Sequence, residues 1–500
     1  MSDALPLYRA ETVRALERAA LSHGLDAAAL MARAGAAVAA LARERWPQAA
    51  RIGVLCGRGN NGGDGYVAAL ALYRAGLDVV VVSTGEPTTA EAREAARAWR
   101  EAGQGVVALG EPLPRVELWI DGLFGVGLSR DVDGALADMM RGIQAQGAPV
   151  LAIDVPSGID ADSAAVRGRA LRADLTLCLI GAKRGLFTAA GREAAGEVCV
   201  DTLGVPSECF AAVSAEAWGV SASSLGDALP VRAIDSHKGR HGRVLCIGGD
   251  AGMEGALLLC AEAAARSGAG SVLAWTRPGA VTALHARRPE VMARAIDAHA
   301  DGAADVGAHG TMLHDALAAT AADVIACGPG LGLGAWARAL FAAALDAPIP
   351  LVLDADALTL LAEAPRALPG AVLTPHPGEA GRLLGWTTAQ VQADRYAALD
   401  ALLSRFRCAV VLKGAGTLIG ATGETPRVLQ AGNAGMASAG MGDVLCGVIA
   451  ALRAQGLGAF EAAWVGALAH SAAGDVAGGR HPRGLLAGDL IDALREVLNP

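Results

Sequence analysis

Short apolar segments alternate with helical segments along the chain, and the alternation starts afresh near its middle. RIGVLC (51–56) and RVLCIGG (243–249) each have the length of one strand and are almost entirely apolar. Strands separated by helices are typical of βαβ units, in which helices cover both faces of a mostly parallel sheet. Because 500 residues are too many for one hydrophobic core, the chain is predicted to be an α/β protein of two domains.

The other elements follow from the same pattern. We expect further strands at 77–83, 116–120, 149–155, 175–180, 270–276, 323–328, 350–356, 370–376 and 408–414, and helices at 8–45, 66–75, 88–102, 134–146, from about 254, at 335–346 and after Gly442. Residues 205–235 lose the alternation and therefore separate the two halves. We predict domains at residues 1–210 and 225–500.

Composition excludes several classes of protein. The net charge is −9 without a basic block and aromatic residues are 4%, so the chain lacks the features of a nucleic-acid-binding protein. The charge-free run 428–442 is too short to span a bilayer, and we expect no secretory signal. Nine cysteines without a CxxC pair indicate reduced thiols. We expect a cytoplasmic, homo-oligomeric enzyme that acts on small molecules and binds neither membrane nor nucleic acid.

Lysine is rare among the 42 basic residues. The three lysines are Lys183, Lys238 and Lys413, and each lies in a glycine-bearing segment. A compact ammonium with an adjustable pKa is suited to a site, although chance placement would produce the same pattern.

The segment GRGNNGGDG (57–65) lies where a strand ends and a helix begins, the position at which open parallel sheets bind ligands. Its glycines allow backbone N–H groups to approach an anion, although an ordinary tight turn has the same signature. Asn, Asp and Ser side chains follow other strands in WIDGLFGVGLSR and AIDVPSGIDAD. Oxygen donors converging from three strand ends would suit a hard cation, and their low charge favours a monovalent one.

An acid and a base also occur near these strand ends. Asp154 ends one apolar strand and Lys183 follows another. They could exchange protons with a substrate if burial or proximity brings their pKa values toward neutrality, or they could form a structural salt bridge.

The motifs GNNGGDG, DGLFGVGL, DVPSGIDAD and GAKRGL together resemble the NAD(P)H-hydrate epimerases over roughly residues 8–205. The resemblance implies a Rossmann-like three-layer domain with a potassium ion bound by Asn61, Asp121 and Ser157, and Asp154 and Lys183 are the candidate catalytic residues of that domain. It places the substrate against Asn60, Asn61, Gly62, Gly63, Asp64, Gly125, Val126, Gly127, Leu128, Ser129, Arg130 and Asp154.

In the second half, GNAGMASAGMGDVLCG (432–447) joins small residues to the start of an apolar helix. Backbone N–H groups at a helix N-terminus form an anion hole, and Asp443 could act there as a base or simply complement the helix dipole. His376 in TPHPGE has a proline on each side, which fixes the backbone and leaves the imidazole projecting. Lys413 in LKGAGT could reach a nucleotide phosphate, and Asp354 in DADAL could serve an ion or a network.

Eight motifs occur in the order found in the ADP- or ATP-dependent NAD(P)H-hydrate dehydratases: HKGRHG, IGG, EGA, ACGPGLG, DADAL, TPHPGE, LKGAGT and the glycine-rich segment at 432–447. The resemblance covers roughly residues 225–500 and implies a ribokinase-like α/β domain that uses ADP or ATP with magnesium. Its hydrate contacts would be Ala256, Gly330, His376 and the catalytic Asp443, and its nucleotide contacts would be Lys413, Gly414, Ala415, Gly416, Thr417 and Gly442.

The two resemblances together predict repair of hydrated NADH and NADPH. The first domain would interconvert the R and S hydrates, and the second would dehydrate the S hydrate, releasing AMP and phosphate if ADP is used. One alternative is a ribokinase-like small-molecule kinase fused to a dinucleotide-binding domain, since fold alone does not fix function. Another is a non-enzymatic nucleotide sensor, which would bind without turnover.

Overall fold

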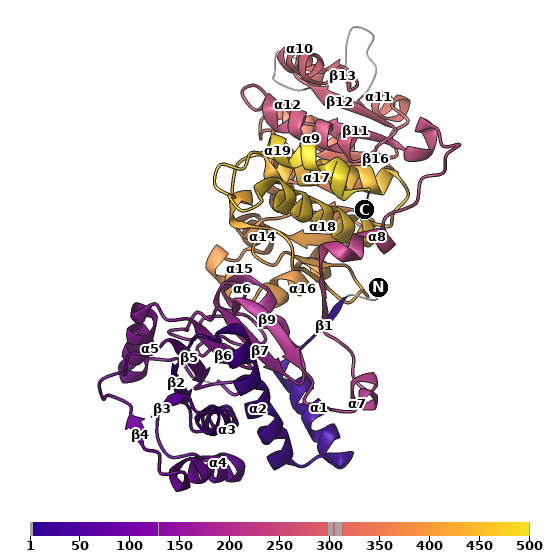
Figure 1. The fold of residues 1–500 in the computed structure, drawn as a ribbon. Helices are drawn as coiled ribbons and strands as arrows, with labels where there is room; N and C mark the ends of the chain where they lie inside the picture. The colour runs from indigo at the N-terminus through magenta and orange to yellow at the C-terminus, as the bar shows by residue number, and fades with distance from the viewer. Residues whose placement is uncertain (1–3, 129, 299–303, 306–312, 500) are drawn as a thin grey trace. The chain divides into compact units, whose positions relative to one another are not determined.

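The computed structural model describes residues 4–128, 130–298, 304–305 and 313–499, and these fall into two compact units. The first unit comprises Leu5–Trp218 and the second begins at Gly219 (Figure 1). Both consist of strands alternating with helices, as the apolar pattern predicts.

In chain order, the elements of the first unit are β1 (Leu5–Tyr8), α1 (Ala10–Ser22), α2 (Ala27–Arg45), β2 (Arg51–Cys56), α3 (Asn60–Arg74), β3 (Asp78–Ser83), α4 (Ala90–Glu101), β4 (Val106–Ala108), β5 (Leu118–Gly122), α5 (Gly134–Gln146), β6 (Val150–Ile153), β7 (Leu175–Leu179), β8 (Ala182–Lys183), η1 (Arg184–Phe187), α6 (Ala189–Ala195), β9 (Glu197–Asp201) and α7 (Ser207–Ala211). The strand β10 (Ala217–Val220) joins the two units along the chain.

The first unit has three layers. Its seven-stranded sheet has the order β4-β3-β2-β5-β6-β7-β9, and every neighbouring pair is parallel. Val54 and Cys56 of β2 pack with α1 to α4 on one face, while Leu55 packs with α5 on the other. The chain order reverses between β2 and β5, so a crevice opens at their carboxyl ends, where Rossmann-like sheets bind ligands.

Two predictions about local structure in this unit are wrong. The expected helix at 8–45 is two helices, because Gly24 adopts a positive φ of 93° and the side chain of Asp26 caps α2. The segment GRGNNGGDG is a loop only as far as Gly59, and α3 begins at Asn60 instead of near residue 66. Glycines favour loops locally, but close packing requires them inside this helix, since a Cβ on Gly62 would lie 1.9 Å from the carbonyl oxygen of Gly57.

In chain order, the elements of the second unit are η2 (Ala222–Ser224), α8 (Leu225–Ala228), η3 (Lys238–His241), β11 (Arg243–Ile247), α9 (Glu254–Arg266), β12 (Ser271–Thr276), α10 (Pro278–Arg287), β13 (Met292–Ala295), β14 (Asp297–Ala298), β15 (Ala304–Asp305), α11 (Leu313–Ala319), β16 (Val324–Cys327), α12 (Ala335–Asp346), β17 (Leu351–Leu353), α13 (Ala355–Glu363), β18 (Val372–Leu373), α14 (Pro377–Leu384), α15 (Thr388–Ala393), α16 (Arg395–Phe406), β19 (Ala409–Leu412), β20 (Leu418–Gly420), β21 (Arg427–Leu429), η4 (Ala434–Met436), α17 (Met441–Ala454), α18 (Ala459–Gly478) and α19 (Ala487–Val497).

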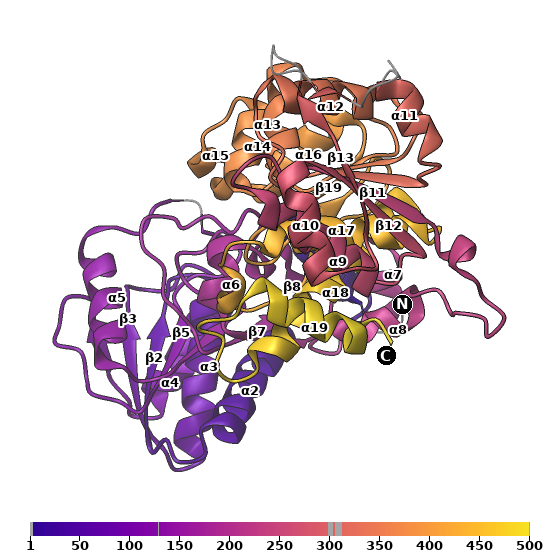
Figure 2. The same cartoon turned by 90° about the horizontal axis from the view of Figure 1, so that it is seen from above.

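Within the second unit the sheet order is β13-β12-β11-β16-β17-β18-β19-β20-β21, parallel from β13 to β19 and antiparallel beyond. Val244 and Cys246 of β11 belong to a core shared with the helices α9, α17, α18 and α19, which lie together in Figure 2. Leu245 and Ile247 are equally buried and point to the opposite face. The strands are therefore buried on both sides, as their continuous apolar runs predict.

Several strands of both units are shorter than predicted or were not predicted. β18 is only Val372–Leu373 within the expected 370–376, because Pro375 and the capped start of α14 end it. The strands β4, β9, β13, β20 and β21 are three to five residues long and are too short to be recognised without their sheet neighbours.

Candidate active sites

A cavity of ≈1080 Å³ opens in the first unit at the carboxyl ends of β2 and β5. Most of the residues predicted to contact the epimerase substrate line it: Asn60, Asn61, Asp64, Gly125, Val126, Gly127, Leu128, Arg130 and Asp154. Ser129, predicted with them, lies outside the described residues. Gly62 and Gly63 do not line the cavity; a Cβ on Gly63 would lie 2.6 Å from Met31 Cε, so both glycines serve helix packing.

Asp154 and Lys183 form a buried ion pair at one side of this cavity. The ammonium of Lys183 is fully buried and donates to Asp154 Oδ1 and, at 2.7 Å, to the carbonyl oxygen of Leu179. Asp154 Oδ1 also accepts the N–H of Leu179 at 3.1 Å. The backbone of Asp154 has a φ of +70°, an unfavourable angle for a residue with a Cβ. Because Asp154 lines the cavity and Lys183 lies behind it, only the carboxylate is placed to meet a ligand directly.

Asp64 and Glu17 supply further acids to the same cavity. Burial raises the pKa of Asp64 well above its usual range, and the charges of Asp154 and Glu17 raise it further. Burial and then Asp154 raise the pKa of Glu17 as well. Burial and neighbouring negative charge both favour the protonated form of a carboxyl group, so Asp64 and Glu17 keep their protons to a higher pH than exposed acids do.

Asp121 and Ser157, two of the three predicted potassium ligands, lie together beneath the cavity. Both are fully buried, and Ser157 Oγ donates to Asp121 Oδ1 at 2.7 Å. The N–H groups of Ser157 and Leu123 donate to the same carboxylate at 2.8 and 3.2 Å. Burial raises the pKa of Asp121 to about 6. Asn61 lies nearby, since its backbone carbonyl oxygen would be 2.9 Å from a Cβ on Gly122.

This donor set suits a monovalent cation. Within the described part of the chain, no basic side chain pairs with Asp121, whose carboxylate is mostly ionised at neutral pH. A buried charge held only by neutral donors is costly, and a cation coordinated by oxygen atoms would offset it.

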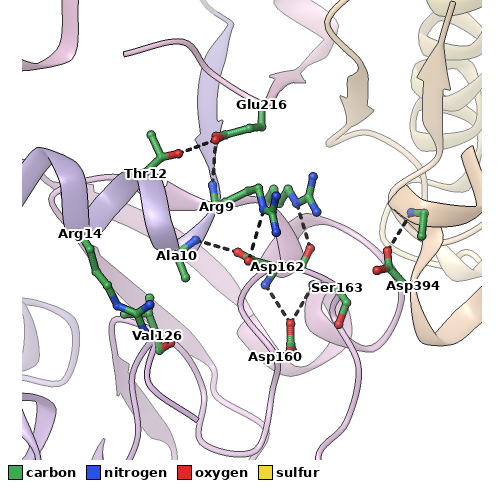
Figure 3. A network of polar contacts seen from close by, with 12 residues as sticks. Arg9, Ala10, Thr12, Arg14, Val126, Asp160, Asp162, Ser163, Glu216 and Asp394 are labelled. Atoms are coloured by element: carbon green, nitrogen blue, oxygen red, sulfur yellow. Dashed lines mark hydrogen bonds and ion pairs between the residues drawn. The ribbon is translucent and has the colours of Figure 1, made fainter. Parts of the chain in front are cut away.

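The cavity wall contributed by α1 was not predicted. Arg14 and Glu17 line the cavity, and Arg14 Nη2 donates to the carbonyl oxygen of Val126 at 2.9 Å (Figure 3). The start of α1 is held by Glu216, which accepts hydrogen bonds from Thr12 Oγ1 and the N–H of Arg9 (Figure 3). Arg14 and Glu17 are three residues apart and therefore lie on one face of α1, but no feature of the sequence indicates which segment that face contacts.

In the second unit, the predicted residues follow the carboxyl ends of successive parallel strands. Gly330 follows β16, Asp354 follows β17, His376 follows β18 and Lys413 follows β19. Ala256 is in α9, and its Cβ would be 3.2 Å from a Cβ on Gly330, whose φ is +58°. The sheet thus brings together residues that are far apart in the sequence.

Asp443 lies in the first turn of α17. Burial raises its pKa to about 7, and the charge of Asp354 adds to the effect. A carboxylate with this pKa can take a proton from a hydroxyl near neutral pH. The start of the helix is held by the buried His470, whose Nε2 lies 2.9 Å from the carbonyl oxygen of Met441. Because burial lowers the pKa of His470 to about 4, the ring is neutral and can donate this bond.

Lys413 is engaged with carboxylates instead of extending freely from its loop. Its Nζ lies 2.7 Å from Asp354 Oδ1 and 3.8 Å from Glu379 Oε2. Burial lowers the pKa of Lys413, but the two carboxylates outweigh it and the pKa is raised overall. Gly442 packs on this pair, because a Cβ there would lie 3.2 Å from both Asp354 Oδ2 and Lys413 Nζ. The pair therefore lies directly beside Asp443.

His376 does more than project from its loop. It caps α14: its Nδ1 accepts the backbone N–H groups of Gly378 and Glu379 at 3.0 and 3.4 Å. The backbone N–H of His376 donates to Glu379 Oε2 at 2.7 Å. Burial and then Lys413 lower the pKa of His376. Since Nδ1 is an acceptor, Nε2 carries the proton of the neutral ring; it lies 3.5 Å from Glu379 Oε1 and can donate a hydrogen bond to a ligand.

The loop at 413–417 folds tightly on itself. Thr417 Oγ1 donates to the carbonyl oxygen of Gly414 at 3.0 Å and accepts the Gly414 N–H at 3.3 Å. Arg395, Glu379 and His470 complete the surroundings of the site and were not predicted. A buried arginine or histidine cannot be distinguished from a surface one by its sequence position alone.

No single helix among the described residues is long and apolar enough to cross a membrane; α1 and α2 meet that test only jointly, across a bend of 120°.

The two units define a class of protein: a two-domain α/β enzyme with a ligand cavity at the switch point of a Rossmann-like sheet and a poised carboxylate at a helix N-terminus in the second domain. Family comparisons agree with this description. The family profile described as NAD(P)H-hydrate dehydratase matches residues 244–496, and the profile described as YjeF-related protein N-terminus matches residues 27–185.

Full-length relatives are similar to the whole chain. The bifunctional NAD(P)H-hydrate repair enzyme Nnr of Coxiella burnetii is 43% identical over 500 residues, 99% of each chain. Its namesake from Escherichia coli K12 is 39% identical over 99% of this chain and 94% of the relative. A solved ribokinase-like superfamily protein from Enterococcus faecalis V583 is 30% identical, with a TM-score of 0.49, over 56% of this chain and 94% of that one. The chain belongs to the family of bifunctional NAD(P)H-hydrate repair enzymes, which confirms the predicted family and fold class.

Proposed function

We propose that this chain repairs hydrated NADH and NADPH in two steps. An epimerase domain at residues 1–210 interconverts the R and S hydrates, and a dehydratase domain at residues 225–500 converts the S hydrate back to NAD(P)H with ADP or ATP. Membership of the family and the two differently equipped sites support this assignment. The observation that carries the dehydratase step is Asp443, a carboxyl with a pKa of about 7 at the N-terminus of α17.

The epimerase step changes the configuration of the ring carbon that carries the added hydroxyl. The hydroxyl must leave as water, the carbon becomes planar, and water returns to the opposite face. Asp154 is the group we assign to the proton transfers, because its carboxylate lines the cavity. Lys183 holds that carboxylate in place through its buried ion pair. Asn60, Asp64 and the segment 125–130 would bind the nucleotide.

The dehydratase step activates the same hydroxyl, because hydroxide is a poor leaving group. Asp443 accepts the hydroxyl proton as the oxygen attacks the terminal phosphoryl group of ADP, and AMP leaves. The phosphate ester then breaks at its C–O bond as the neighbouring ring carbon loses a proton, which restores the dihydronicotinamide double bond. His376, Ala256 and Gly330 would orient the hydrate, while the loop 413–417 and Gly442 would contact the nucleotide.

The two sites would use different cations. Asn61, Asp121 and Ser157 would hold potassium, which would supply positive charge under the substrate and offset the buried carboxylate. Magnesium would enter with the nucleotide and neutralise its phosphate charge beside Asp354 and Asp443. We also propose that the chain is cytoplasmic, in keeping with its nine free thiols, and that it is a homo-oligomer.

The experiment is incubation of the purified chain with mixed NADH hydrate epimers and either ADP or ATP. Recovery of the dihydronicotinamide absorbance from both epimers supports the proposal, and we expect ADP to support the reaction. Absence of recovery with either nucleotide would refute the dehydratase assignment. Recovery of the S epimer alone, with the R epimer left unchanged, would refute the epimerase assignment.

A further inference from the structure

A buried arginine lies beneath the nucleotide loop. Arg395, the first residue of α16, is 0% exposed. Its Nη2 donates to the carbonyl oxygen of Leu412 at 2.8 Å, and both Nη atoms lie 3.2 Å from the carbonyl oxygen of Lys413. Nη1 also donates to Gln392 Oε1 at 2.9 Å. One planar guanidinium thus joins α16 to the last residue of β19 and the first residue of the loop.

These bonds fix the two peptide planes on either side of the Lys413 Cα. In a trans peptide the C=O and N–H groups point in opposite directions. Because the carbonyl groups of Leu412 and Lys413 point to Arg395, the following N–H groups point away from it. The Lys413 N–H donates to the carbonyl oxygen of Pro375 at 2.9 Å, and the Gly414 N–H donates to the loop hydroxyl group at 3.3 Å.

Fixing both planes sets the backbone dihedral angles of Lys413, and with them the direction of its side chain. That side chain ends 2.7 Å from Asp354 Oδ1, beside Gly442 and the catalytic carboxylate. Arg395 touches none of the reacting groups in these contacts. Its effect on the site passes through the backbone of Lys413.

Gly414 gives an independent reason to connect Arg395 with the loop. Its φ is +141°, and a Cβ at this position would lie 2.8 Å from Arg395 Nη1. The loop backbone therefore approaches the guanidinium as closely as a glycine allows. A lysine could not replace the arginine at this position, because a single ammonium lacks the planar fork that serves acceptors in three directions.

We infer that Arg395 is a positioning residue for the nucleotide site, which orients Lys413 and holds the loop 413–417 ready to bind ADP or ATP. The inference rests on the proposed function of this loop. Burial of a cation is unfavourable unless its hydrogen-bonding groups are satisfied, and the carbonyl groups of Leu412 and Lys413 satisfy the guanidinium of Arg395 while it holds the loop in place. Burial lowers the pKa of Arg395 only to about 10, so the guanidinium remains charged at neutral pH.

The test compares R395K and Q392L with the control R405K in the full-length chain. Arg405 lies on the same helix and is exposed, so its replacement should change no kinetic constant. We expect R395K to raise the KM for ADP at least tenfold, with the KM for the hydrate within twofold of the parent. Gln392 is exposed, so Q392L should fold and raise the KM for ADP two- to fivefold. Epimerisation should be unchanged in all three variants.

Hydrogen exchange without nucleotide provides the structural readout. Amides at 413–417 should lose protection in R395K while those of α17 keep theirs. A merely structural arginine would lower the amount of active enzyme, and so kcat, without changing the KM for ADP. An unchanged KM for ADP in R395K, or in Q392L should R395K fail to fold, overturns the inference. If the parent chain itself fails to turn over the hydrate with nucleotide, the proposed function has failed instead.

Discussion

Replacement of Asp443 by asparagine should remove dehydration and at the same time stabilise the domain that carries it. The pKa of Asp443 is about 7 in the folded chain against an ordinary value of 3.8. Between these two pH values the native state binds a proton that the unfolded state has lost. Stability contributed by this group therefore falls as pH rises from about 4 to about 7, and stays low above that.

The magnitude follows from the size of this difference. About three pH units, at about 1.36 kcal/mol for each, correspond to about 4 kcal/mol of unfavourable ionisation in the folded state. The side chain is partly exposed and solvent screens it, so we expect D443N to gain about 2 kcal/mol at pH 8. The gain should shrink toward pH 4 and disappear below it, where the carboxyl is neutral in both the native and the unfolded state.

The assay is urea unfolding at pH 5 and pH 8, with a short hydrogen-exchange pulse read in peptides from α17 and α18. This readout separates the second unit from the first, which a single spectroscopic transition would not. Glu290, an exposed carboxyl in the same unit, provides the control E290Q. A D443N chain whose stability relative to the parent is no greater at pH 8 than at pH 5 would contradict this account. So would dehydration that survives the substitution.

Other changes should separate the roles of the two sites. The kcat/KM for dehydration should rise about tenfold per pH unit below pH 7 and level off above it, because the base must lose its proton, whose pKa in Asp443 is about 7. D154N should lower epimerisation, followed by chromatography of the hydrates, at least 100-fold and leave dehydration of the S hydrate unchanged. K183M should leave the buried Asp154 carboxylate unpaired and destabilise the first unit by about 3 kcal/mol, measured by the same labelling pulse on α3. D121N should abolish the difference in melting temperature between KCl and choline chloride, a readout independent of activity. G125A, whose Cβ would lie 3.2 Å from Asp154 Oδ2, should slow epimerisation about tenfold without changing the melting temperature of either unit.

Much of the architecture was predictable because it depends on local pattern. Apolar runs such as IGVLC form strands buried on both faces, and the helices between them match their predicted ranges closely at α4 and α5. The glycine-rich segment at 57–65 was the main local error. Glycine favours loops when a segment is considered by itself, whereas in the folded unit Gly62 and Gly63 allow α3 to pack against the Gly57 carbonyl group and Met31.

The chemical groups of both sites, and the strand ends at which they occur, follow from the amino-acid order alone: Asp154, His376, Lys413 and Asp443 all belong to recognisable motifs. What these groups face depends on the tertiary fold. Lys413 is held by Asp354 and Glu379, and Lys183 lies behind Asp154 instead of in the cavity. Contacts of this kind join segments distant in the chain, and burial and neighbouring charge then set the pKa values. Neither is encoded by the spacing of residues along the sequence.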